Sequence, residues 1–190
     1  MVRFTTVGSR GHWLAALLVG IAMAGGCASN TPPDPLDDGV TAYRDGRTSD
    51  AERIWLETLA ESELAGEDDS RLAQSLFVLA NLAIHQQRFE EAKALLERWV
   101  EIHERTPEIG DENFADGVEA LAGISMVQGN FARASELYER ALEIRQNEPS
   151  EDLIAIAESL ERLANAYEAQ GRRDDATPLY ERAIQIREEV

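Results

Sequence analysis

The sequence predicts an all-α protein built from about four copies of a helix pair, and three observations support this. Alanine, leucine, glutamate and arginine are abundant among the 190 residues, and these residue types favour helices. Residues 137–145 recur as residues 179–187, with seven of nine positions identical at an offset of 42. Within each copy the apolar residues fall three and four apart, which is the spacing of one helix face.

The first 26 residues are predicted to be a signal peptide. Arg3 and Arg10 make the start positive, and residues 14–24 form an apolar stretch of eleven residues. That stretch lies within the signal-peptide range and is well short of the roughly 20 residues that span a bilayer. Residues 24–27, Ala-Gly-Gly-Cys, resemble the bacterial lipoprotein signal, or lipobox, with alanine where leucine is usual.

This resemblance implies cleavage before Cys27 and lipidation of its sulfur. A diacylglyceryl thioether, usually with an N-acyl chain such as palmitate, would anchor the protein, because two or three chains hold stably where one does not. The alternative is an ordinary cleaved leader with an incidental cysteine, although Cys27 is the only cysteine of the sequence. Ala28 follows it and no aspartate does, a pattern similar to lipoproteins of the outer membrane. We therefore expect a periplasm-facing anchor in the outer membrane rather than the inner membrane.

Residues 27–38 are expected to form the lipidated cysteine and a proline-rich tether. Three prolines stand within residues 32–35, and this composition favours an extended chain that rises about 3 Å per residue. The tether would hold the following domain about 30 Å from the lipid, and simple disorder would give nearly the same reach.

The folded domain is expected over residues 39–190. In the first unit Asp37, Asp38 and Gly39 fall early in the first helix, so that helix is predicted to be short or frayed. In the last unit Gly171 is expected to end the first helix in the left-handed conformation. The four units are placed at about 35–62, 69–104, 111–146 and 150–189.

Small residues recur where the paired helices would approach most closely. These positions are Ala80, Ala122 and Ala164 on the first helices and Ala92, Ala134 and Ala176 on the second helices. The last helix carries Leu179, Ile184 and Ile186, and Ile184 lies off its inward stripe. We therefore expect a modest exposed apolar strip at the C-terminal end.

The unit resembles the tetratricopeptide repeat (TPR). Residues 129–134, Gly-Asn-Phe-Ala-Arg-Ala, followed by Leu137, Tyr138 and Ala141, match its pattern of glycine, aromatic and alanine positions. The spacing of 42 and the phrase Leu-Tyr-Glu-Arg-Ala-Leu are similar to the kinesin-light-chain type of TPR. The resemblance implies antiparallel helix pairs stacked into a right-handed superhelix, whose concave face, lined by the first helices, holds a peptide or a partner helix.

Residues one step off the buried stripe of the first helices are the candidates for this groove. Asn81 and Asn165 stand out, because an amide can bond both the N–H and the C=O of an extended peptide. The alternative is that these asparagines bond the neighbouring helix. The carboxylate clamp of the chaperone-binding TPR proteins is absent from the matching positions. The candidate partner-binding residues are Tyr43, Phe77, Asn81, His85, Met126, Arg162 and Asn165.

The charge balance narrows the class of partner. The sequence has 18 basic and 36 acidic residues, a net charge of −18. Such a surface repels nucleic acid and anionic lipid head groups and suits a basic protein or peptide, although a simply solvated surface is the alternative.

The sequence carries no motif for catalysis, a metal or a cofactor. His85 and His103 are 18 residues apart with no partner at metal-ligand spacing, and the sequence lacks a nucleophile elbow, a Walker loop and a zinc-protease motif. We therefore expect a non-enzymatic protein that takes no cofactor, metal or small-molecule substrate. The predicted function is that of a membrane-anchored TPR adaptor or scaffold in the bacterial cell envelope. The alternative is a self-assembling structural subunit of an envelope complex.

Overall fold

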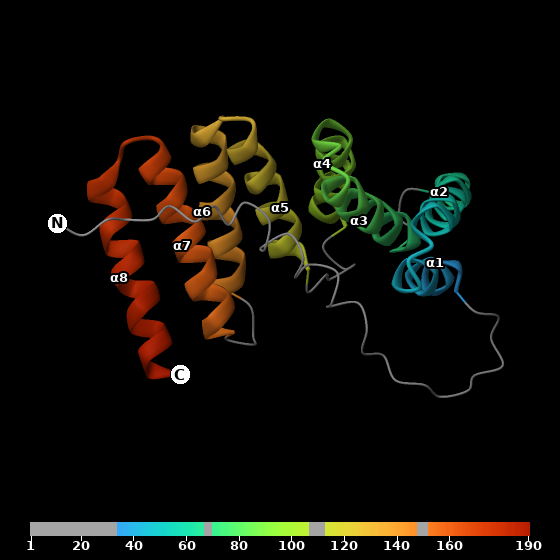
Figure 1. Ribbon diagram of the computed structural model, residues 1–190. Helices are drawn as coiled ribbons and strands as arrows, with labels where there is room; N and C mark the ends of the chain where they lie inside the picture. The colour runs from blue at the N-terminus through green and yellow to red at the C-terminus, as the bar shows by residue number, and fades with distance from the viewer. Residues whose placement is uncertain (1–33, 67–69, 107–112, 148–151) are drawn as a thin grey trace.

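The computed structural model describes residues 34–66, 70–106, 113–147 and 152–190, which form eight α-helices and no strand (Figure 1). The predicted signal peptide and Cys27 lie outside the described residues. None of the helices in the described part is long and apolar enough to cross a membrane. The helices are α1 (Pro35–Arg44), α2 (Thr48–Ala65), α3 (Ser70–His85), α4 (Phe89–Arg105), α5 (Phe114–Val127), α6 (Phe131–Asn147), α7 (Leu153–Ala169) and α8 (Arg173–Glu189).

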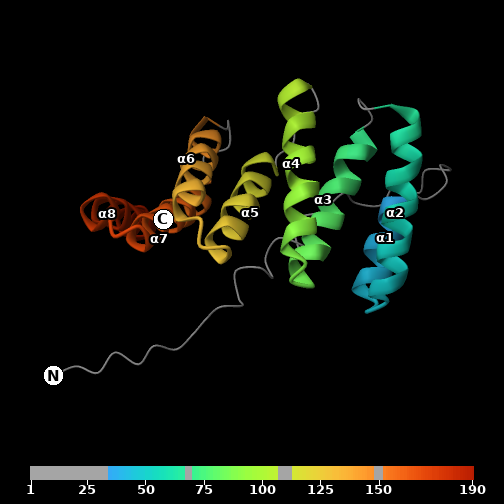
Figure 2. The ribbon, with the colours of Figure 1, turned by 90° about the horizontal axis from the view of Figure 1, so that it is seen from above.

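Consecutive helices pair into four units, α1 with α2, α3 with α4, α5 with α6 and α7 with α8. Figure 2 shows these pairs in chain order along a row, with the first and last units at opposite ends. This confirms the predicted all-α stack of helix pairs. The first helix of the first unit has only 10 residues, against 14 to 18 in the others, and so it is short, as the sequence predicted.

Alanine at the helix contacts lets the paired helices approach closely. All six alanines that recur in the sequence are buried, and none is more than 1% exposed. Larger side chains fill the space between units, among them Trp55, Leu96 and Tyr138, which stand at the same position of the first three second helices. The buried residues form three clusters along the stack. The half-buried Leu59 and Leu95 pack against both the first and the central cluster, and Leu142 and Leu179 pack against both the central and the last one.

The turn inside each unit has the same geometry. Gly46, Gly129 and Gly171 have φ values of 78°, 76° and 79°, and Gln87 takes the same place with φ 59°. In the last unit the N–H of Gly171 donates to Glu168 O at 2.8 Å, and the N–H of Arg172 donates to Tyr167 O at 2.9 Å. This is the Schellman arrangement, in which a left-handed residue ends the first helix.

Replacing Gln87 with glycine should raise the free energy of unfolding by up to about 1 kcal/mol. A non-glycine residue in the left-handed region is strained by about 1–2 kcal/mol, and the added freedom of glycine in the unfolded chain offsets part of the gain. Denaturant unfolding followed by circular dichroism would measure the change. The reverse substitution, Gly129→Gln, should lower stability; equal stabilities for all three proteins would contradict the strain at Gln87.

Candidate interaction surface

An aromatic cluster fills the junction between the second and third units. Trp99 on α4 is fully buried, with its ring centroid 5.1 Å from that of Phe77, 4.2 Å from His103 and 5.6 Å from Phe114. Gly117 on α5 makes room for it, because a β-carbon there would lie 2.1 Å from Cζ3 of Trp99. This cluster stabilises the stack and presents little surface to a partner.

A network of charges joins the third unit to the fourth. Glu119 on α5 has a buried side chain that pairs with Arg162 on α7 and lies 3.5 Å from Nη2 of Arg145 on α6. Ser159 on α7 donates a hydrogen bond to the same carboxylate, and Arg145 also pairs with Asp116. Three helices thus share one buried carboxylate, which is compensated by two guanidinium groups.

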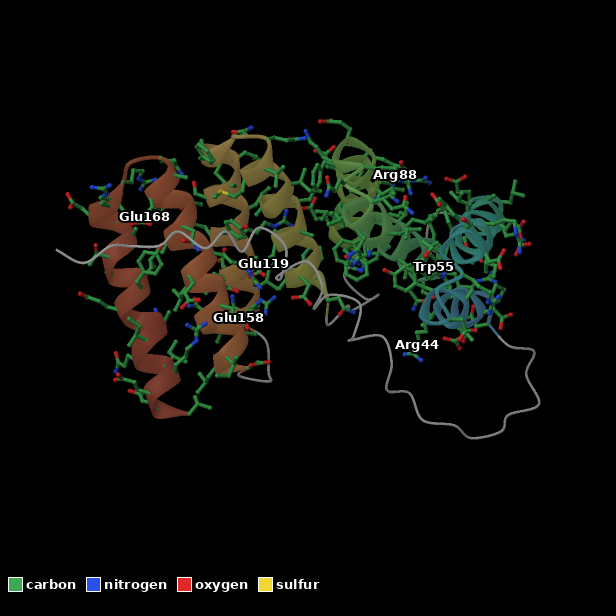
Figure 3. All side chains as sticks on the ribbon, viewed as in Figure 1. Arg44, Trp55, Arg88, Glu119, Glu158 and Glu168 are labelled. Carbon is green, nitrogen blue, oxygen red and sulfur yellow. The ribbon has the colours of Figure 1, made fainter. Side chains whose placement is uncertain are left out.

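Arg162 extends this network to the solvent. Its Nη2 lies 3.1 Å from Oε2 of Glu158, one helical turn earlier on α7. Figure 3 shows the labelled Glu119 and Glu158 close together on α5 and α7. The half-buried guanidinium of Arg162 is therefore held by acids from both units, and its position is fixed before any partner arrives.

Tyr138 on α6 lies beside the network, and burial raises its pKa to about 12, with a further contribution from the charge of Glu119. The usual tyrosine pKa is 10. Because the folded pKa exceeds the unfolded one, the stability that Tyr138 contributes is fully present below pH 10 and is lost as the pH rises toward 12.

Unfolding free energy should therefore fall between about pH 10 and pH 12, and Tyr138→Phe should remove part of this fall. Burial and the nearby Glu168 also raise the pKa of Tyr180 to about 12, so Tyr180→Phe should remove a second part and the double variant most of the fall. Denaturant unfolding of the parent and the three variants across this pH range would measure it. An unchanged slope in Tyr138→Phe would contradict the buried, neutral tyrosine.

The solvent-facing side of α7 carries mostly acids. We call Glu158, Glu161, Arg162, Asn165 and Glu168 the α7 surface. The Tyr180 hydroxyl on α8 donates to Oδ1 of Asn165 at 2.8 Å and to Oε2 of Glu168 at 3.3 Å. The charges of these three carboxylates are offset in part by the guanidinium of Arg162 and by that of Arg187 on α8, which pairs with Glu161. The surface thus keeps a small negative charge, which favours cationic ligands.

Two of the seven predicted groove residues, Arg162 and Asn165, belong to the α7 surface. The others lie along the earlier units. Tyr43 on α1 is half-buried, with its ring 6.0 Å from that of Trp55, whose place Figure 3 marks. His85 is exposed at the end of α3, and Met126 is half-buried near the end of α5. These residues do not converge on one site.

Phe77 and Asn81 are placed in the core, which corrects their assignment to the groove surface. Phe77 stacks on Trp99, and Asn81 is 2% exposed, with its Nδ2 donating to Phe77 O at 3.0 Å. The reason is that α3 lies inside the stack, so neighbouring helices cover nearly every face of it. The amide of Asn81 is thus bonded within its own helix rather than across to a neighbour.

Sequence reasoning did not find Arg145 and Ser159, which complete the site around Glu119. The recurrence of Arg145 as Arg187 in the repeated phrase was the available signal. Among the described residues, no three histidine, cysteine, aspartate or glutamate side chains gather in a way that could hold a metal ion.

Comparisons with known proteins agree with this architecture. Residues 72–106 and 117–189 match family models described as tetratricopeptide repeat, and together these matches cover more than half of the chain. None of the curated proteins matches its sequence.

Among solved structures, BtubC (BKLC) from P. vanneervenii is 25% identical with a TM-score of 0.71. The match covers 83% of this chain and 66% of BtubC, so the chain spans slightly less than two thirds of that protein. A kinesin light chain of Podospora anserina with nearly identical TPR-like repeats is 22% identical, with a TM-score of 0.66 and coverage of 82% and 74%. MamA is 19% identical, with a TM-score of 0.63 and coverage of 82% and 77%.

The last two structures show the fold alone at these identities. The matched repeats, the four helix pairs and the shared left-handed turns all lead to the same assignment: the chain belongs to the tetratricopeptide-repeat family.

Proposed function

We propose that the protein is a membrane-anchored adaptor of the bacterial cell envelope, which holds a basic partner protein at the α7 surface. TPR repeats are modules for protein and peptide partners. The observation that carries the proposal is the run of three acids on one first helix, the exposed Glu158 and Glu168 and the half-buried Glu161, with Arg162 fixed among them. Such a surface attracts cationic side chains and steers their approach.

A crosslinking pull-down from intact envelopes tests this function. Lys93 is the only lysine of the sequence, so reagents that link two amines would crosslink this protein inefficiently. A carbodiimide instead couples lysines of the partner to carboxylates of this chain. The partner should be captured by the parent protein and lost with the double variant Glu158→Lys, Glu168→Lys.

The matched control is the double variant Glu136→Lys, Glu143→Lys on α6, which makes the same charge change outside the α7 surface. Capture by the control and not by the α7 variant supports the adaptor function. Equal capture by both variants would show that the α7 surface does not hold the partner.

The anchor in this proposal is a lipid on Cys27, and it is supported by the sequence pattern of residues 1–27. Cys27→Ser should move the protein from the detergent phase to the aqueous phase in a phase-partition experiment, because the acyl chains supply the membrane affinity. Fractionation of the membranes would then test the outer-membrane position. A variant that still enters the detergent phase would contradict lipidation at Cys27.

The alternative, a self-assembling structural subunit, is favoured by one observation. Ile184 is 55% exposed on α8, as expected from the sequence for a strip at the C-terminal end. Sedimentation over a series of concentrations separates the two functions. The adaptor should stay monomeric, whereas a structural subunit should assemble as its concentration rises.

A further inference from the structure

The outer face of α8 has the residue pattern of a face of α6, and on α6 this face is covered by α7. On α6 the residues Ser135 and Leu137 are buried, and Gln170 at the end of α7 donates a hydrogen bond to Oγ of Ser135 at 2.9 Å. The corresponding residues of α8, 42 positions later, are Thr177, which is exposed, and Leu179, which is half-buried. The α6 face thus receives a helix, and its copy on α8 has no helix over it among the described residues.

The charges repeat in the same way. Glu119 and Arg145 recur as Glu161 and Arg187, and the second pair is also in contact, with Nη2 of Arg187 lying 2.9 Å from Oε2 of Glu161. In the third unit the following helix adds Arg162 to this pair. The Glu119 side chain is consequently 8% exposed, whereas that of Glu161 is 34% exposed.

We propose that this end face, formed by Glu161, Leu179, Ile184 and Arg187, docks an amphipathic helix of a partner protein. The partner helix presents apolar side chains to Leu179 and Ile184, and an arginine or lysine to Glu161. The α6–α7 contact serves as the template, because there the same face receives a helix with Arg162 directed at the equivalent acid. This inference deepens the proposed adaptor function by naming the chemistry of its partner, and it rests on that function only for the existence of the partner.

A second copy of the chain is a poor occupant, because its free first helix carries the wrong charge. Aligning the turns at Gly46 and Gly171 places Asp37 of α1 where α7 has Arg162, and Asp34 where α7 has Ser159. Head-to-tail stacking would therefore bring carboxylates against Glu161, and like charges across an interface oppose binding. The acid of the end face, Glu161, is half-buried beside Arg187 and instead favours a helix that brings a basic side chain to it.

A tethered probe helix tests the docking. Val190 stands 42 positions after Glu148, so a copy of residues 149–172 fused after Val190 continues the register of the repeat. Tethering gives the probe a high effective concentration. We expect the fusion to raise the melting temperature by about 5 °C, and to protect the backbone amides of α8 from hydrogen exchange.

Three variants sharpen this test. Ile184→Glu in the chain should abolish the gain, and so should a probe in which the copy of Arg162 is replaced by glutamate. Leu64→Glu, which changes a leucine that is 90% exposed on α2, is the matched control and should keep the gain. A fusion without any gain, or with a gain that survives both Ile184→Glu and the arginine replacement, would overturn the proposal.

Sedimentation of the unfused protein completes the test. Monomers at all concentrations support a foreign helix as occupant, whereas dimers that Ile184→Glu dissociates would assign the face to a second copy and overturn the proposal. The probe needs no natural partner. A docked probe combined with failed capture from envelopes would therefore count against the adaptor function and not against the end face.

Discussion

Replacing Trp99 with alanine should lower the free energy of unfolding by about 3–5 kcal/mol, the largest effect expected for a single substitution in this protein. Trp99 is fully buried between the second and third units and contacts Phe77, His103 and Phe114. Alanine would leave a cavity that the flanking helices cannot fill completely. Denaturant unfolding followed by far-ultraviolet circular dichroism measures the loss without relying on the deleted chromophore.

The other junctions suggest a partial rescue. The position of Trp99 is occupied by Thr58, Ala141 and Ala183 in the other units, and the position of Gly117 is occupied by Ser75 and Ser159. Adding Gly117→Ser to Trp99→Ala makes this junction resemble that of α6 and α7, and should recover part of the stability. Gly117→Ala alone should destabilise, since its β-carbon meets the Trp99 ring. A loss below about 1 kcal/mol for Trp99→Ala would contradict the close packing described here.

Removing the carboxylate of Glu119 should cost about 3 kcal/mol. In Glu119→Ala the guanidinium of Arg145 keeps Asp116 but loses its second acid, while Arg162 loses its link to α5. A buried charge without full compensation is destabilising, and equilibrium unfolding of the variant measures the cost.

Glu161→Ala is the matched control, because Glu161 forms the same pair with Arg187 near the C-terminal end. This pair is more exposed, so its loss should cost less than about 1 kcal/mol. Comparable losses in the two variants would mean that burial is not what makes the Glu119 network strong.

The repeat allowed the fold to be predicted from the sequence. A period of 42 with alanines at fixed positions determines two helices per unit and their contact, and the structure buries each of these alanines. The period could not predict the single positions at which one unit differs from the others. Trp99 stands where two other units have alanine, and its complement Gly117 lies 18 residues away on another helix. The large Trp99 and the small Gly117 fit together only because α4 and α5 pack against each other, and the residue pattern of one helix does not reveal this contact.

The candidate site was predictable only in its last unit. Arg162 and Asn165 are accessible because no helix pair of the described part packs beyond the unit of α7 and α8, whereas Phe77 and Asn81 occupy similar places on α3 and are covered. The expectation that groove residues lie one position away from the buried stripe considers each first helix in isolation. Inside the stack, the helices on both sides bury these positions as well.

The aromatic junction also determines what optical spectroscopy can observe. Trp55 and Trp99 both lie in the first two units, and the described part of the third and fourth units contains no tryptophan. Each unit of such a stack depends mainly on its neighbours, so the two halves can melt at different denaturant concentrations. Emission from Trp55 and Trp99 will then report on the N-terminal half and its junction with α5, while helical ellipticity follows the whole domain. Separate midpoints for these two signals would reveal a half-unfolded intermediate that neither signal detects by itself.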